Sequence, residues 1–313
     1  MNLRYLLIIL FTVACAIPAY SQWDAQISQY WRAKTYFNPA FAGETENLQA
    51  TLLHRQQWIG ITNAPKTLLV MGDMPLNFLG RVHGVGAIMM TESIGLFSNT
   101  MTGAQYTYKK NFKNKGSLNF GVQIGIARIG FDASKIEIVW DEETDDAMPT
   151  GDQQASTFDA NFGVTWITPN YYVGLSTTHV TKPSFDLGDN YSSFIARAFY
   201  LTGGYNIQFQ NSLYELQPSF LVKSDAVVTQ YDVTARVVYN KMFNGGISWR
   251  KDDGFVFLLG IKYKAFDAGY AYDLSTSEIS KASSGTHEFF VRYSMPIKLG
   301  KTEKNRHRSV RIL

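Results

Sequence analysis

Hydrophobic and polar residues alternate in the stretch 157–166, TFDANFGVTW. The apolar face of this pattern has an aromatic residue at each end, Phe158 and Trp166. The other face is polar or small and includes the charged Asp159. A period of two residues predicts a β-strand. A strand with one aromatic-bracketed apolar face and one polar face is typical of a barrel wall between lipid and a water-filled lumen.

The same alternation recurs along most of the chain from residue 48, and it predicts about fourteen strands. Aromatic residues bracket several of the apolar faces, as the two interfacial girdles of a membrane barrel require. The predicted strands lie at 48–57, 65–75, 82–92, 98–110, 117–130, 157–167, 170–179, 196–208, 213–223, 229–240, 243–250, 254–264, 266–274 and 286–296.

The links between the predicted strands alternate in length. Every second link is short, for example 168–169 and 241–242, whereas three of the others are long, at 131–156, 180–195 and 275–285. Bacterial outer-membrane barrels have short periplasmic turns and longer outer loops, and a soluble β-sandwich predicts no such alternation. We therefore predict an all-β fold, a transmembrane antiparallel up-and-down β-barrel with an even number of strands and both termini in the periplasm.

The chain before the first predicted strand lacks this alternation. A basic residue precedes the apolar run Tyr5–Ala14, and the small residues Ala19 and Ser21 complete a typical secretory signal peptide. The next segment has a turn signal at Asn38-Pro39 and many aromatic residues, so we expect a periplasmic segment or a plug of the lumen. The expected parts are a signal peptide (1–21), a periplasmic or plug segment (22–47), the barrel (48–297) and a basic periplasmic tail (298–313).

Composition is consistent with a barrel and excludes several functions. The mean hydropathy of −0.13 is compatible with membrane insertion, because lumen residues and loops dilute the lipid-facing half of each strand. The net charge of +3 is too mild to indicate nucleic-acid binding, and no zinc-type spacing or RNP motif occurs. Cys15, the only cysteine, falls within the signal peptide, so disulfides and cysteine chemistry are excluded from the mature chain.

No enzymatic or metal-binding constellation stands out, so we expect neither catalysis nor a cofactor or metal. The five histidines lack metal-ligand spacing, and no Gly-x-Ser-x-Gly or Walker-type motif occurs. Gly84-Val85-Gly86 is interpreted as a strand that bends around the barrel rather than a phosphate site. The acidic run Asp141–Asp146 is either a solvated outer loop or a calcium-binding one. Charged residues predicted to face the lumen either line a channel or pair with one another: Asp159, Asp232, Arg236 and Glu288.

The C-terminal tail is strongly basic. Its cations are Lys298, Lys301, Lys304, Arg306, Arg308 and Arg311, against the single acid Glu303. A short run of like charge is often only a solvated chain end. On the barrel topology the tail lies in the periplasm, where peptidoglycan or an acidic partner could bind it. Both interpretations stay open.

Four blocks of the sequence stand out as motifs. The first is SQY at 28–30 with NPAFAG at 38–43, and the second is RQQWIG at 55–60 with APKT at 64–67. Two shorter blocks are ESIG at 92–95 and GTHE at 285–288. All four resemble segments of the PorP/SprF family of outer-membrane proteins from the Bacteroidetes type IX secretion system, and the first two blocks are specific. One departure is Asn63, where many members have glycine, and the tail after Pro296 is longer than the family pattern requires.

The resemblance implies a non-enzymatic barrel that serves protein secretion or gliding motility. Such barrels act with periplasmic ring or peptidoglycan-binding components, or help secreted adhesins reach and stay on the cell surface. Three functions therefore stay open: a secretion or gliding component, an anchor for a secreted adhesin or other cargo, and a small-solute porin or transporter. The motif residues have a structural or a partner-binding role, and they are Gln29, Tyr30, Asn38, Pro39, Ala40, Gly43, Arg55, Gln57, Trp58, Gly60, Pro65 and Thr67.

Overall fold

The structure is a computed structural model, and it describes residues 24–113, 115–135, 151–187, 191–210 and 212–297. The predicted signal peptide, most of the acidic-loop region and the basic tail lie outside the described residues. No described helix is both long enough and apolar enough to cross a membrane.

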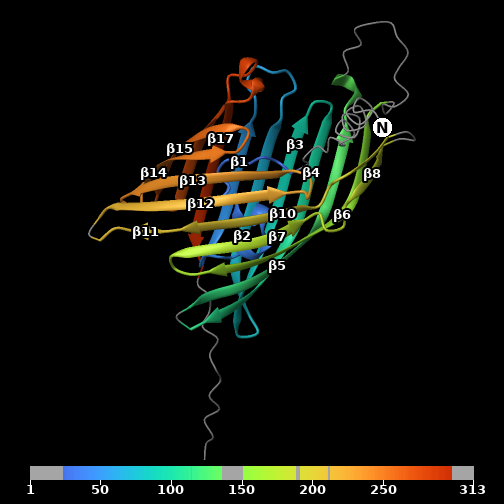
Figure 1. The fold of residues 1–313 in the computed structure, drawn as a ribbon. Helices are drawn as coiled ribbons and strands as arrows, with labels where there is room; N and C mark the ends of the chain where they lie inside the picture. The colour runs from blue at the N-terminus through green and yellow to red at the C-terminus, as the bar shows by residue number, and fades with distance from the viewer. Residues whose placement is uncertain (1–23, 114, 136–150, 188–190, 211, 298–313) are drawn as a thin grey trace, which may run out of the picture.

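Fourteen antiparallel strands close into a barrel, which confirms the predicted fold and strand number (Figure 1). Neighbours in the barrel follow one another in the chain, and β1 pairs with β17 to close it. The barrel strands are β1 (Asn47–Gln56), β2 (Lys66–Phe78), β3 (Arg81–Ile94), β4 (Phe97–Phe112), β5 (Gly116–Phe131), β6 (Gln153–Ile167), β7 (Tyr171–Thr178), β10 (Ala198–Tyr205), β12 (Tyr214–Ser224), β13 (Thr229–Tyr239), β14 (Phe243–Arg250), β15 (Gly254–Tyr263), β16 (Phe266–Ser275) and β17 (Thr286–Pro296).

Three shorter strands are not counted among the fourteen barrel strands. β11 (Ile207–Gln208) continues β10 along β12, and β8 (Ser184–Leu187) pairs with β9 (Tyr191–Phe194) as a hairpin. Phe185 and Leu187 of this hairpin are buried in one apolar cluster with residues of β5, such as Ile129. Ile129 shares the inner face of β5 with Asn119 and Gln123, so the hairpin folds inward over the wall.

The two faces of the wall differ as the alternation predicts. Phe158 and Phe162 of β6 are 56% and 48% exposed, whereas Asp159 between them is 6% exposed. An apolar outer face of this kind is stable against lipid and not against water. Aromatic pairs also form a girdle at one rim, namely Phe112–Trp166, Tyr171–Tyr205, Tyr214–Tyr239 and Phe266–Tyr293.

The two rims carry different links. The short-turn rim holds tight connections such as 79–80, 168–170, 240–242 and 264–265, and strands β1 and β17 have their outer chain ends there. Several of these turns use left-handed backbone, for example Leu79 at φ +50° followed by Gly80 at φ +74°. That geometry matches the right-handed twist of a two-residue hairpin. The long-loop rim holds the links 132–152, 179–197 and 276–285.

Candidate functional site

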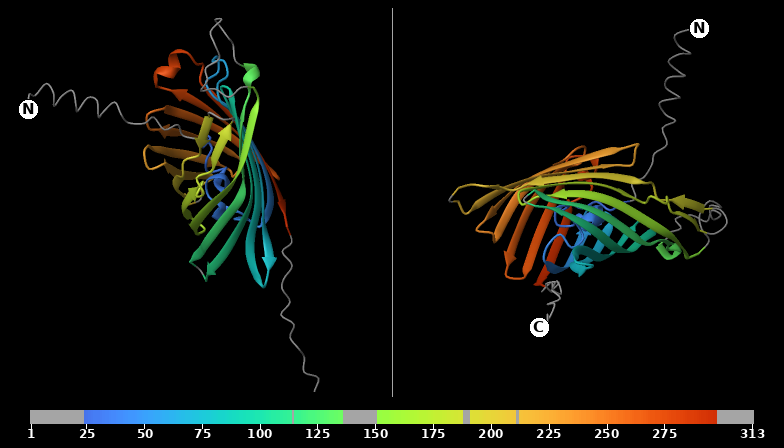
Figure 2. Two further views of the ribbon diagram at one scale, coloured as in Figure 1. Left: turned by 90° about the vertical axis from the view of Figure 1, so that its right-hand side faces the viewer. Right: turned by 90° about the horizontal axis from the view of Figure 1, so that it is seen from below.

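The N-terminal segment 24–46, here called the plug, lies inside the barrel (Figure 2). It contains α2 (Lys34–Phe37) and the 3-10 turn η1 (Pro39–Phe41). Its side chains are as buried as those of a soluble core, and Tyr30, Phe37 and Phe41 are at most 2% exposed. Asp24 contacts His179 at the long-loop rim, and the plug runs from there to β1 at the short-turn rim.

Glycines on the inner wall allow the plug backbone to approach closely. A Cβ at Gly121 of β5 would stand 2.1 Å from the backbone nitrogen of Ala40, and one at Gly84 of β3 would stand 1.8 Å from the carbonyl oxygen of Ala42. Real Cβ atoms do not approach other atoms so closely, so only glycine fits at these positions. Contact with the plug therefore explains Gly84 better than the predicted bend of the strand does.

Asn38 of the motif NPAFAG joins the plug to strands β6 and β7 of the wall by hydrogen bonds. Its Oδ1 accepts a hydrogen bond from the backbone of Ala40 at 2.9 Å, which caps η1. Its Nδ2 donates to the carbonyl oxygens of Val164 and Leu175, each at 3.2 Å. One buried side chain thus both shapes the turn and fixes it to two strands.

Wall side chains satisfy further backbone groups of the plug. Thr107 Oγ1 donates to the carbonyl of Pro39 at 2.7 Å, and Ser176 Oγ donates to that of Phe37 at 2.7 Å. Asp73 accepts from the backbone N–H of Gly43 at 2.8 Å. An unpaired backbone group in the plug would cost free energy, so these bonds are needed for the plug to remain in place.

The most strongly connected site is the Arg55 cluster, which we define as Ser28, Arg55, Arg250, Asp273 and Glu288. Glu288 accepts from the backbone N–H of Ser28 at 2.8 Å, and Ser28 Oγ donates to Asp273 at 2.7 Å. Arg55 donates to Asp273 at 2.8 Å and to Glu288 at 3.3 Å, and it is 2% exposed. Arg250 donates to Asp273 at 3.1 Å and to Ser28 Oγ at 3.1 Å.

Three separate motif blocks therefore meet at one point inside the barrel. Ser28 comes from SQY in the plug, Arg55 from RQQWIG on β1, and Glu288 from GTHE on β17. Arg55 and Glu288 are direct cross-strand neighbours in the β1–β17 ladder. The carboxylate of Glu288 also accepts the backbone N–H of Gln29 at 2.8 Å. The cluster holds the start of the plug against the wall.

Three of the four predicted lumen charges are paired and do not line an open channel. Asp232 pairs with Arg250 at 2.6 Å, Asp159 pairs with His179 at 2.8 Å, and Glu288 belongs to the Arg55 cluster. Arg236 differs, because its guanidinium lies over the ring of Trp31 at 4.2 Å.

The first described residue, Asp24, is held by a second buried cluster near the long-loop rim. Its carboxylate pairs with His179 Nε2 at 2.8 Å and accepts a hydrogen bond from the Tyr200 hydroxyl, and Lys223 Nζ donates to its carbonyl at 2.8 Å. Burial lowers the pKa of His179, but the carboxylates of Asp24 and Asp159 outweigh burial and raise this pKa to about 10. Burial raises the pKa of Asp24, yet His179 and Lys223 hold it below its usual range.

These pKa shifts predict how the His179 contact depends on pH. A folded pKa above the ordinary 6.5 means that the contact stabilises the protein fully below pH 6.5 and loses this effect as the pH rises through about 10. His179→Gln should cost about 3 kcal/mol near neutral pH, because it removes the cation that lies between two buried carboxylates. We expect the stability difference between wild type and this variant, measured by urea unfolding, to shrink as the pH rises from about 6.5 to about 10 and to be nearly gone above pH 10. A stability difference between wild type and His179→Gln that does not change with pH would contradict this assignment of the His179 charge.

The remaining motif residues lie in the plug, in the wall or at the long-loop rim. Tyr30 donates from its hydroxyl to Thr234 at 2.9 Å, and buried Thr67 donates to Glu92 of the ESIG block at 2.8 Å. Between β1 and β2 the chain turns back, and the backbone N–H of Gln57 donates to the carbonyl of Pro65 at 2.9 Å. Gly60 has φ +101° in this loop.

Trp58 lies at the mouth of the barrel on the long-loop rim. Its backbone N–H donates to Thr286 Oγ1 at 3.1 Å, and its φ of +48° is left-handed. Its side chain lines a cavity of about 280 Å³ together with Arg55 and Arg250. Trp58 thus stands next to the Arg55 cluster, although its sequence position also fits an interfacial anchor.

Sequence reasoning did not single out several residues of these clusters. Ser28 lay in a matched motif, but Asp24, His179, Arg250 and Asp273 carried no signal beyond an inward position in the alternation or a place in the plug. Within the part of the chain that the structure describes, no group of three or more His, Cys, Asp and Glu side chains is arranged to hold a metal ion.

A profile described as "Type IX secretion system membrane protein PorP/SprF" matches residues 19–293. The chain belongs to the PorP/SprF family. The Arg55 cluster of this PorP/SprF protein lies within the matched range, as do the plug and all fourteen barrel strands for most of their length. A search of curated proteins found no match.

Solved structures similar to this PorP/SprF protein are barrels. The Pseudomonas putida toluene transporter TodX has a TM-score of 0.53 at 10% identity, over 85% of this chain and 93% of that one. A TodX deltaS2S3 mutant, titled a monoaromatic hydrocarbon channel, has a TM-score of 0.50 at 10% identity, over 83% and 93%. At this identity the likeness shows the fold alone. Family membership and fold together identify the protein as an outer-membrane β-barrel component of type IX secretion.

Proposed function

We propose that the protein acts as a non-enzymatic binding component of the type IX secretion and gliding machinery. The observation that carries this proposal is the plug, which lies inside the barrel and is fixed by motif blocks that resemble the family pattern. A barrel filled in this way presents its two rims to partners. The burial of Gln29, Tyr30, Asn38, Pro39 and Ala40 supports a structural role for these motif residues.

The short-turn rim is the proposed periplasmic face, because short turns are periplasmic in bacterial barrels. Both outer chain ends of the barrel, at Asn47 and Pro296, lie at this rim. The basic tail follows Pro296, so it would extend into the periplasm. Its cations Lys301, Lys304, Arg306, Arg308 and Arg311 are the proposed contacts for an acidic ring component or a peptidoglycan-linked partner. The signal peptide over 1–21 is the proposed export signal.

Deletion of the gene should reduce the secretion of type IX cargo, and the wild-type gene should restore it. Comparing secreted and surface proteins of the deletion strain with those of the parent by mass spectrometry measures the effect. Normal secretion together with normal surface display would contradict the proposal.

An anchor for a secreted adhesin is the alternative function within the same class. The long-loop rim supports it, because the cavity beside Trp58 lies where outer loops meet the lumen mouth. Loss of one surface adhesin with unchanged secretion of other cargo would favour the anchor over the secretion component.

A small-solute porin or transporter is the third function, and the plug argues against it. We expect the wild-type protein to show little or no conductance in planar lipid bilayers, because buried plug side chains fill the lumen cross-section. Stable channels of porin size in the wild-type protein would contradict this expectation.

A further inference from the structure

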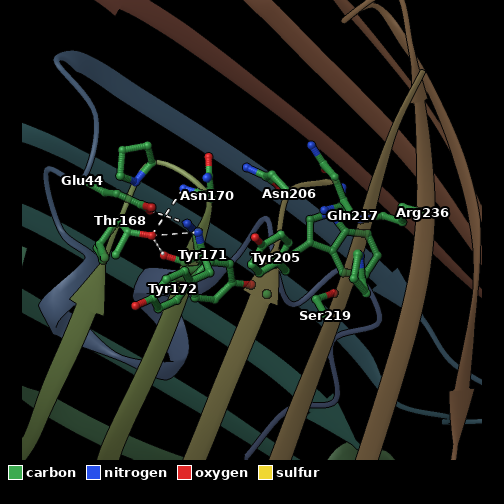
Figure 3. A pocket seen from close by; sticks show the side chains of 16 residues that line it. Glu44, Thr168, Asn170, Tyr171, Tyr172, Tyr205, Asn206, Gln217, Ser219 and Arg236 are labelled. Carbon is green, nitrogen blue, oxygen red and sulfur yellow. Dashed lines mark hydrogen bonds and ion pairs between the residues drawn. The ribbon is translucent and has the colours of Figure 1, made fainter. Parts of the chain in front are cut away.

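The lumen opens at the short-turn rim into two adjoining cavities that the plug does not fill. They have volumes of about 270 and 370 Å³, and Trp31, Gln217 and Arg236 line both. Figure 3 shows the smaller one, in which Gln217 of β12 and Arg236 of β13 lie close together. Volumes of this size fit a small ligand or the end of a larger one.

The larger cavity has an excess of positive charge. Two acidic side chains line it, against the cations Arg32, Arg236, Lys241, Lys262 and Arg292. Of the two acids, Asp267 already pairs with Arg32 at 2.9 Å. Arg292 donates to neutral oxygens, Thr51 Oγ1 at 3.1 Å and the carbonyl of Arg32. The field in this cavity therefore attracts anions.

Arg236 is the central cation of this mouth, because it lines both cavities. Its guanidinium lies over the Trp31 ring at 4.2 Å, which fixes the plane of the group. Its Nε is buried without a hydrogen-bond partner, and it forms no ion pair with any residue the structure describes. A half-buried guanidinium without a carboxylate partner keeps free donors, and its planar shape lets it donate two parallel bonds to an oxyanion.

Neighbouring amides can add donors to the same ligand. Asn244 uses its Oδ1 to accept from Arg32 Nη2 at 3.2 Å, which leaves its Nδ2 available as a donor. Gln217 faces Arg236 across the β12–β13 ladder, and its Nε2 donates to Glu215 at 3.4 Å, so Asn244 is the amide with a free donor. We infer that the short-turn mouth is a binding site for the carboxylate or phosphate group of a small ligand, with Arg236 as its main contact.

The test is isothermal titration of the purified mature protein in detergent with two probes, sodium succinate and inorganic phosphate, at constant ionic strength. Arg236→Gln should weaken binding of the preferred probe by about tenfold or more, which is the effect expected from losing a charged hydrogen bond. Arg236→Lys keeps the charge but loses the planar fork, so it should bind between wild type and Arg236→Gln. Tighter binding of one probe identifies the carboxylate or the phosphate as the natural chemistry.

The matched control is Arg81→Gln, which removes the same charge at the same rim but outside both cavities. It should change affinity by no more than about twofold, since a rim charge acts only through a screened field. Far-UV circular dichroism and the heat-dependent gel shift of barrels establish that each variant is folded. Equal affinity of Arg236→Gln and Arg81→Gln, or no binding of either probe to the wild type at about 10 mM, would overturn the inference.

Discussion

Arg55→Ala is expected to lower the free energy of unfolding by about 3–5 kcal/mol, the largest effect that we predict for a single side chain. Arg55 is 2% exposed and neutralises Asp273 and Glu288, which are 3% and 0% exposed. Removing it leaves two buried carboxylates beside one another and loses the hydrogen bond to Ser28 Oγ at 2.8 Å. Urea unfolding of the detergent-solubilised protein, followed by tryptophan fluorescence, measures the change.

Arg128→Ala is the matched control for this variant, because Arg128 lies exposed on β5 and, among the described residues, donates to Ser156 Oγ alone, at 3.0 Å. Its cost should be at most about 1 kcal/mol. In a double-mutant cycle, Arg55→Ala and Glu288→Gln should not be additive, because both act on one cluster. Equal effects of the two arginine variants would show that the Arg55 cluster does not hold the plug.

Gly121→Ala is expected to displace the plug and to destabilise the protein by about 1–3 kcal/mol, although it adds only one methyl group. The three heavy atoms nearest to the new Cβ are all backbone atoms of Pro39 and Ala40, the nearest at 2.1 Å. A backbone cannot rotate away as a side chain can, so the plug must move. Faster proteolysis of the plug and higher conductance in planar bilayers are the expected readouts.

Gly72→Ala supplies the control, because Gly72 lies on the outward face of β2 and its nearest heavy atom is 3.7 Å from the new Cβ. Its effect on stability should stay within about 0.5 kcal/mol. Equal proteolysis rates and equal conductance for Gly121→Ala and Gly72→Ala would contradict the close contact between the plug backbone and the wall at Gly121.

The strands could be predicted from sequence because lipid imposes a two-residue period on every wall residue. β14 and β17 have the predicted bounds, and the other strands differ mainly at their ends. The alternation predicts an end of β2 at Pro75, whereas the strand continues to Phe78 because the following residues still pair with β3. β6 begins at Gln153, where polar residues hide the alternation and only pairing with β5 continues the strand.

The contacts of the plug could not be predicted in the same way. The turn at Asn38-Pro39 is a local signal, and the structure has a capped 3-10 turn there. The ion pairs of Arg55 with Glu288 and of Asp24 with His179 join residues 233 and 155 positions apart. Local alternation of residues does not predict such pairs. They depend on how the strands are aligned once the barrel has closed, and on the path of the plug, whose sequence does not alternate.

The central claim is that a plugged PorP/SprF barrel works by binding periplasmic partners through its short-turn rim and tail. An affinity-tagged protein recovered from membranes of its own cells, followed by mass spectrometry, tests this claim most directly. We expect type IX ring or peptidoglycan-binding components with the wild type, and clearly less of them when Lys301, Lys304, Arg306, Arg308 and Arg311 are replaced by glutamine. Recovery of the same partners with that variant would contradict the role of the tail. Recovery of no periplasmic component with the wild type would contradict the account as a whole.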